Sequence, residues 1–122
     1  KSHKHNNQNL LRWNYLHNKN SIKMTFEDLK KDVLQWGLDR NLIVPQNQLK
    51  QGLKMVSEVG ELCDAIIKKD EEKQIDGIGD VLVTVIILSE QLGYDPVKCL
   101  EVAYNEIKNR TGKTINGTFI KD

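Results

Sequence analysis

The sequence lacks a large excess of charge of either sign, because 18 lysines and arginines are nearly balanced by 17 aspartates and glutamates, for a net charge of +1. A protein that binds nucleic-acid polymers in general needs a basic excess on one face. Here only the N-terminal segment and the tail after Asn105 lean basic. We therefore expect no nucleic-acid polymer among the partners of this protein.

Long apolar runs are also missing. The longest one, from Val81 to Leu88, is too short to span a bilayer. No signal-peptide pattern precedes the domain. These absences predict a cytoplasmic protein without a membrane partner.

Cysteine is scarce, and its two positions form no CxxC pair. Cys63 and Cys99 each fall at an apolar position of a predicted helix, and no histidine lies near either of them in the sequence. This pattern favours buried free thiols in a reducing compartment over a disulfide or a metal site.

What is present is the composition of one ordinary globular domain, with 122 residues of which 39% are hydrophobic and 29% charged. Residues 1–23 are rich in Asn, Lys and His and lack helical periodicity, so we interpret them as an N-terminal extension of uncertain order that activity does not require. Met24 and Thr25 precede the first clear helix, and Thr25 is a good N-cap. We therefore place a helical domain at residues 24–122.

Helix start and stop signals divide this domain into four helices. Pro45 ends the first connection, Gly93 is a helix stop, and Asp95 is an N-cap followed by a proline at the first helical position. Asn116-Gly117 lies between short β-prone segments, as in a hairpin. The fold class is predicted as an all-α four-helix bundle with a short C-terminal hairpin or extended tail. The expected helices cover about 25–40, 48–69, 74–91 and 96–109.

Apolar positions predict which helix faces are buried. Trp36 lies on an apolar stripe of the first helix and is expected in the core rather than stacked on a base. The segment Val81–Leu88 is apolar on nearly every side, and helix is preferred over strand because of its length and the spacing of its acids. In so short a protein, this also suggests burial against another subunit. The residues expected to face inward on the fourth helix are Val97, Leu100, Val102, Ala103 and Ile107.

Two pairs of acids suggest a metal site. Glu58 and Glu61 share a face of the second helix, and Asp76 and Asp80 share a face of the third. If the apolar stripes of these helices pack together, the acids at their margins converge in one crevice. Clustered carboxylates suit a hard cation such as Mg²⁺, which then holds phosphates. Two solvated helix faces are the alternative. The two stripes are Leu53, Val56, Val59, Cys63 and Ile66, and Ile78, Val81, Leu82, Val85 and Leu88.

The order of these segments resembles the MazG-like, all-α nucleoside-triphosphate pyrophosphohydrolase superfamily. Its motif is ExxE, a variable spacer and then ExxD. The segment from Lys54 to Glu61, Lys-Met-Val-Ser-Glu-Val-Gly-Glu, resembles the first half, and Gly79-Asp80-Val81-Leu82 resembles the end of the second. The segment from Asn105 to Lys113 is similar to the closing basic segment of that family.

The resemblance implies Mg²⁺-dependent hydrolysis of a nucleoside triphosphate to a monophosphate and pyrophosphate. The metal ligands implied are Glu58, Glu61, Asp76 and Asp80, with Glu58 and Glu61 catalytic and one glutamate, or Asp76, acting as the base. Phosphate contacts are implied for Lys54, Asn105, Lys108 and Arg110. A homodimer or homotetramer is implied as well.

Some of these residues also have an ordinary structural interpretation. Lys54 lies one turn before Glu58, where lysine often forms only a surface ion pair. Lys108 and Arg110 are also usual cations at a helix C-terminus.

The sequence departs from the family pattern at Gly77, where the ExxD glutamate would fall. Asp76, four residues before Asp80, is expected to replace it, and Asp64 is taken as an acid outside the site. Because Glu forms helices better than Gly, Gly77→Glu is expected to be tolerated. The departure keeps two alternatives open, a nucleotide-binding protein without turnover and a purely structural helical oligomer.

Overall fold

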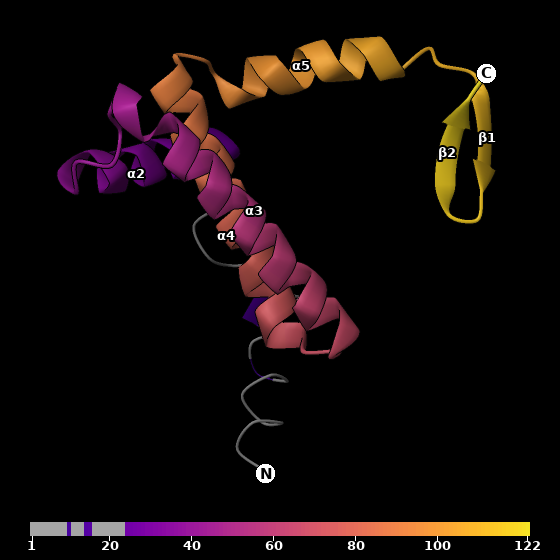
Figure 1. The fold of residues 1–122 in the computed structure, drawn as a ribbon, viewed down its shortest axis with the longest axis horizontal. Helices are drawn as coiled ribbons and strands as arrows, with labels where there is room; N and C mark the ends of the chain where they lie inside the picture. Colours follow the sequence, from indigo (N-terminus) through magenta and orange to yellow (C-terminus); the bar gives the residue numbers. More distant parts are fainter. Residues whose placement is uncertain (1–9, 11–13, 16–23) are drawn as a thin grey trace.

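The computed structural model describes residues 10, 14, 15 and 24–122, and the expectations for the other residues of 1–23 lie outside that part. The described chain is mostly helical and ends in a hairpin, which confirms the predicted fold class (Figure 1). Its elements are α2 (Phe26–Asp39), the 3₁₀ turn η1 (Pro45–Asn47), α3 (Gln48–Ile67), α4 (Glu71–Leu92), α5 (Pro96–Ile107), β1 (Gly112–Ile115) and β2 (Thr118–Lys121).

Local signals define where the helices begin and end. The Thr25 hydroxyl accepts a hydrogen bond from the Asp28 backbone N–H at 3.1 Å, and the Asp28 carboxylate accepts one from the Thr25 N–H at 3.2 Å. This capping box satisfies two N–H groups that α2 leaves unpaired. Asp70 and Asp95 cap α4 and α5 with a single side-chain hydrogen bond each, accepted from the backbone N–H of Lys73 and Val97. Gly93 ends α4 with a φ of 82°, a conformation that favours glycine.

The hairpin also forms where its turn residues predict it. Asn116 and Gly117 have φ values of 50° and 80°, and both positions of a type I′ turn need a positive φ. The strands are antiparallel, with Lys113 opposite Ile120. Every residue of both strands is exposed.

The centre of the domain is the antiparallel pair of α3 and α4, and α2 packs against α4. The buried apolar core is small and consists of Ala65, Ile86 and Ile87. Buried and half-buried polar side chains tie the elements together around it. The Gln91 side chain donates a hydrogen bond to the Leu42 carbonyl at 2.8 Å, and the Gln51 side chain donates one to the Thr84 carbonyl at 3.3 Å.

The expected packing of the two apolar stripes is wrong. On α3, Leu53 and Val56 are each 63% exposed, and the rest of that stripe faces outward too. The buried positions of α3 are instead Glu58 and Ala65, with Leu62 half-buried. The prediction failed because α3 carries apolar residues on two faces, and periodicity alone does not say which face packs. The apolar segment of α4 is likewise only partly covered by its own chain.

Helix α5 departs from the end of α4 and extends away from the other helices, with the hairpin beyond it (Figure 1). All residues from Val97 to the end of the chain are exposed, and Leu100 is 69% exposed, so the expected inward face of this helix is wrong for the single chain. Trp36 is not in the core either, because it is exposed and stacks under the Arg40 guanidinium at 4.4 Å.

The two cysteines are free, as expected, but both are exposed rather than buried. None of the helices described in residues 24–122 combines the length and apolar character that a bilayer crossing requires.

Candidate functional site

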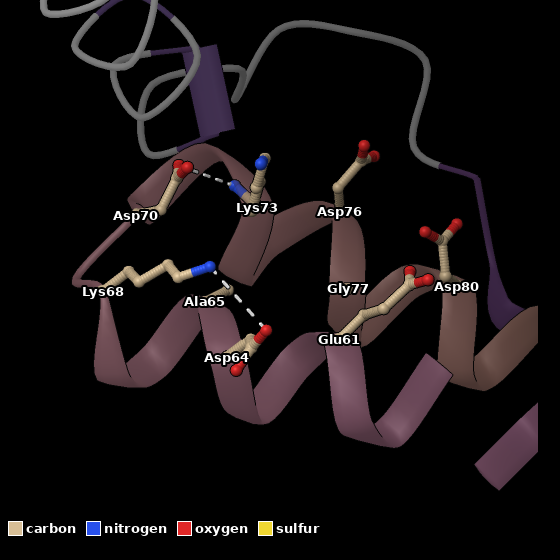
Figure 2. A pocket seen from close by; sticks show the side chains of 9 residues that line it. All are labelled: Glu61, Asp64, Ala65, Lys68, Asp70, Lys73, Asp76, Gly77 and Asp80. Carbon is tan, nitrogen blue, oxygen red and sulfur yellow. Dashed lines mark hydrogen bonds and ion pairs between the residues drawn. The ribbon is translucent and has the colours of Figure 1, made fainter. Parts of the chain in front are cut away.

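A cavity of about 310 Å³ lies where α3 turns into α4 (Figure 2). Asp76 and Asp80 lie one turn apart on α4, and Glu61 faces them from α3, because antiparallel helices place the end of one beside the start of the next. Figure 2 shows the Glu61 side chain extending toward Asp80, whose carboxylate projects from α4 on the same side as that of Asp76. The residues lining the cavity are Glu61, Asp64, Ala65, Lys68, Asp70, Lys73, Asp76, Gly77 and Asp80.

Glu58 lies one turn before Glu61 and is only 8% exposed, so its carboxylate is largely buried between the helices. Its Oε1 atom is 3.1 Å from the Lys54 Nζ atom. Its Oε2 atom is buried and has no hydrogen-bond partner. A buried carboxylate oxygen without a partner is costly, and such groups in native proteins often mark a site that binds something else.

The acids of the two helices influence one another. Partial burial raises the pKa of Asp80 above its usual value, and the charges of Glu58 and Asp76 raise it further, while Lys54 opposes them. The pKa of Lys54 is raised first by its hydrogen bond to Glu58, and also by the charges of Glu61 and Asp80. The carboxylates of both helices therefore form one electrostatic group.

These residues suit a magnesium ion by their chemistry. Hard cations prefer carboxylate oxygens, and the unpaired Oε2 of Glu58 and the raised pKa of Asp80 both reflect negative charge without full compensation. The side chains do not stand in a ready coordination arrangement, because no three His, Cys, Asp or Glu side chains of the described residues are grouped closely enough to hold a metal. These side chains would have to rotate before they could hold a cation together.

Gly77 forms part of the cavity wall where α3 and α4 approach closely. A Cβ added there would lie 3.1 Å from Leu62 Cδ1 and 3.3 Å from Leu62 Cβ. Helix propensity alone does not decide whether Gly77→Glu is tolerated, because a side chain at this position starts against α3 and Leu62 must shift by a few tenths of an ångström to admit it. Asp76, one residue earlier, carries the acid that lines the cavity instead.

Sequence reasoning missed the lysines at the loop end of the cavity. Lys68 and Lys73 line it, and Lys68 lies 3.7 Å from Asp64. Asp64 therefore belongs to the same cavity and is no longer an acid outside the site. The charged turn between the helices was visible in the sequence, but only the folded chain shows that it closes onto the acids.

The basic residues of the C-terminal segment are not brought to this cavity within one chain. Asn105, Lys108 and Arg110 are exposed, at and after the far end of α5. Helix α5 starts from the opposite end of α4, and about 24 Å of helix separates Asp76 from the last residue of α4. Their predicted contact with phosphates stays a prediction.

Comparison with known proteins gives a family for this arrangement. Residues 46–111, just over half of the chain, match the family described as the MazG nucleotide pyrophosphohydrolase domain. The matched residues include α3, α4, α5 and all the acids considered above.

A phage protein is also similar. An uncharacterized 18.2 kDa protein from the rep-hol intergenic region of Haemophilus phage HP1 is 38% identical over 71 residues, which cover 58% of this chain and 44% of the phage protein. The chain thus matches less than half of the length of that relative. No solved structure gave a significant match.

Proposed function

This chain belongs to the MazG nucleotide pyrophosphohydrolase family, and we propose that it hydrolyses a nucleoside triphosphate to a monophosphate and pyrophosphate with Mg²⁺. The observation that carries the proposal is the meeting of Glu61, Asp76 and Asp80 at one cavity, beside a buried Glu58 with one unpaired oxygen. The proposed location is the cytoplasm, where triphosphates are abundant.

The proposed metal ligands are Glu58, Glu61, Asp76 and Asp80. When bound, Mg²⁺ supplies positive charge that offsets the repulsion between phosphate oxygens and an incoming water. The four acids lie on two helices that pack against each other, so their backbones are held in place while the side chains rotate. Glu58 starts from a buried position, whereas the other three are open to solvent.

Glu61 is well placed to act as the base, because it lines the cavity and faces Asp80 (Figure 2). In the proposed reaction one oxygen of the Glu61 carboxylate accepts a proton from water, while its other oxygen would serve the metal. The water oxygen bonds to one of the two phosphorus atoms that flank the bridging oxygen between the α- and β-phosphates. The bond from that phosphorus to the bridging oxygen breaks, and pyrophosphate and the monophosphate separate.

The substrate phosphates need cations, and the cavity offers two. Lys68 and Lys73 lie at its loop end, where they neutralise phosphate charge in the proposed complex. Lys54 is a third, one turn before Glu58.

A second copy of the chain is proposed to complete the site. Asn105 belongs to the last turn of α5, and Lys108 and Arg110 follow this helix, which extends away from α3 and α4 (Figure 1), so these residues contact substrate only if α5 reaches the cavity of another copy. The exposed apolar faces of α3 and α5 support such an assembly, because isolated domains rarely expose so much apolar surface. A homodimer or homotetramer fits this requirement.

The first test supplies ordinary and damaged nucleoside triphosphates with Mg²⁺ and measures the released products. We expect pyrophosphate and monophosphate in equal amounts, and Glu61→Gln should remove most of the activity. Glu72→Gln is the control, since Glu72 is an exposed acid on α4 that does not line the cavity. Release of orthophosphate instead of pyrophosphate, or normal activity in Glu61→Gln, would contradict the proposal.

The shared site has its own test. Glu61→Gln and Arg110→Ala proteins, each inactive alone, are mixed after reversible dissociation. If two copies share each site, a mixed dimer keeps one intact site, so activity should return to about a quarter of the wild-type value. A mixture as inactive as its components would show that each chain uses its own α5 residues or none.

A binding protein without turnover is the second candidate, and Gly77 favours it because the family acid is missing there. Calorimetry with a triphosphate separates the two candidates. Tight binding that leaves the nucleotide intact in the presence of Mg²⁺ would select this alternative.

A further inference from the structure

The Lys54 side chain occupies an unusual position for a surface lysine. It emerges from α3 one turn before Glu58, and its Nζ atom lies 3.1 Å from Glu58 Oε1. The Lys54 side chain is 59% exposed, whereas that of Glu58 is only 10% exposed. A cation from the surface is thus directed at a buried carboxylate whose other oxygen has no partner.

The ammonium also lies within the field of the other acids. The pKa of Lys54 is raised chiefly by Glu58, and the charges of Glu61 and Asp80 add to the effect. In return, Lys54 lowers the pKa of Asp80 against the effects of burial and neighbouring acids. Lys54 therefore supplies positive charge to three of the four acids that are proposed to bind Mg²⁺.

We propose that Lys54 is an internal counter-ion that occupies the cation position of the metal-free site, and that Mg²⁺ must displace its ammonium to bind. This inference rests on the proposed metal site. A lysine ammonium and Mg²⁺ repel each other, and the two oxygens of one carboxylate are adjacent, so Mg²⁺ on the unpaired Oε2 of Glu58 would be opposed by an ammonium that stays on Oε1. The displacement is easy, because most of the lysine side chain is already in solvent and its flexible stem has other conformations.

The exchange has a consequence for substrate binding. While Lys54 contacts Glu58, its charge is directed at carboxylates and is not available to phosphates. Once displaced, the same ammonium remains anchored one turn from the metal ligands and is free to contact a triphosphate. Binding of Mg²⁺ then prepares the site for an anion in two ways, through the charge of the metal and through the released lysine.

The test measures Mg²⁺ binding by calorimetry, without nucleotide and at mildly alkaline pH, for the wild type and three variants. Lys54→Met keeps the apolar length of the side chain and removes the competing charge, so its Mg²⁺ dissociation constant should fall about tenfold. Lys54→Arg keeps the charge and should stay within about twofold of the wild type. Lys50→Met is the control, because Lys50 lies two turns from Glu58 and should not change the affinity.

A second measurement follows the lysine itself. Acylation by an amine-reactive reagent, read by mass spectrometry, should be slow at Lys54 in the metal-free protein and several times faster with saturating Mg²⁺. The acylation rate of Lys50 should not change. This readout needs neither substrate nor turnover.

The outcomes separate this inference from the proposed function. If Lys54→Met binds Mg²⁺ no more tightly than the wild type, Lys54 does not compete with the metal, and the inference is overturned while the metal site stands. If none of the four proteins binds Mg²⁺, both the inference and the proposed metal site are overturned. Circular dichroism checks that the variants remain folded, which the exposure of Lys54 leads us to expect.

Discussion

Replacing Glu58 with methionine should stabilise the protein in the absence of metal and abolish its stabilisation by Mg²⁺. Glu58 Oε2 is buried without a hydrogen-bond partner, and an unsatisfied buried polar group costs about 1–3 kcal/mol. The variant also loses the helical ion pair with Lys54, which contributes only about 0.3–0.5 kcal/mol. Since methionine fills a similar volume with apolar atoms, the free energy of unfolding should rise by about 1–2 kcal/mol.

Addition of Mg²⁺ should reverse which of the two proteins, the wild type or Glu58→Met, is the more stable. A ligand that binds only the folded state stabilises it by about 2.7 kcal/mol at one hundred times its dissociation constant. The wild type should gain this amount, and the Glu58→Met protein should gain almost nothing because it lacks a central ligand. The wild type is then the more stable protein in Mg²⁺ and the less stable one without it.

The assay is urea unfolding followed by circular dichroism, with and without Mg²⁺, at one fixed protein concentration because association also changes stability. Glu72→Met is the matched control, since Glu72 is exposed and its substitution should change stability by less than about 0.5 kcal/mol in either condition. If Glu58→Met is less stable than the wild type without metal, Glu58 serves the fold, and its unpaired oxygen is not a sign of a binding site.

Three other predictions follow from particular residues. Gly79→Ala should stabilise the metal-free protein by about 1 kcal/mol, because nothing lies within 4 Å of the added Cβ. Gly77→Ala should be about 1–3 kcal/mol less stable than Gly79→Ala in urea unfolding, because its Cβ would press against Leu62. Equal stabilisation by both would mean that the helices are not close at Gly77. Asp76→Asn should raise the Mg²⁺ concentration for half-maximal pyrophosphate release several-fold, and Glu72→Gln should not; similar values for the two would remove Asp76 from the ligand set. The pKa of Asp95 is lowered chiefly by the hydrogen bond that it accepts from the Val97 N–H, and also by Lys30. The stability that Asp95 contributes is therefore present above the ordinary aspartate pKa of about 4 and is lost as the pH falls below it. In thermal unfolding, the wild type should therefore lose more stability than Asp95→Asn as the pH falls through that range, and parallel losses would show that Asp95 does not carry it.

Much of the secondary structure was predictable because its signals are local. Thr25 and Asp95 cap the helices that they were expected to cap, and Gly93 ends α4. The Asn116-Gly117 turn forms the expected hairpin. Each of these features depends on a few adjacent residues whose preferred backbone conformations are known from their chemistry.

Packing was less predictable, because it depends on residues that are distant in the sequence. Helix α3 has apolar residues on two faces, and the more continuous stripe, with Leu53 and Val56, is the one left exposed. The prediction that Trp36 is buried was wrong for a related reason, since an apolar side chain on a helix is buried only where a neighbouring element covers it. In the described chain the Trp36 ring is instead covered by the Arg40 guanidinium, which stacks on it.

The site was predictable in part. The spacing of Asp76 and Asp80 and the position of Glu61 placed these acids together, and the cavity between α3 and α4 brings them to one place. The burial of Glu58 was not foreseen, because the wrong face of α3 was expected to pack. Lys68 and Lys73 were missed because only the closed turn between the helices brings them to the acids.

The contact between Gly77 and Leu62 constrains the order in which this sequence can change. A glutamate at position 77 would restore the family motif, yet its Cβ would begin 3.1 Å from Leu62 Cδ1. If Leu62 were first replaced by a smaller residue, there would be space for the glutamate side chain at position 77. A protein in which only Leu62 has been replaced has a cavity between α3 and α4. A protein in which only Gly77 has been replaced by glutamate is overpacked there. The effects of substitutions at positions 62 and 77 on stability are therefore expected to depend on each other, whereas Asp76 lines the cavity without needing a side chain at position 77.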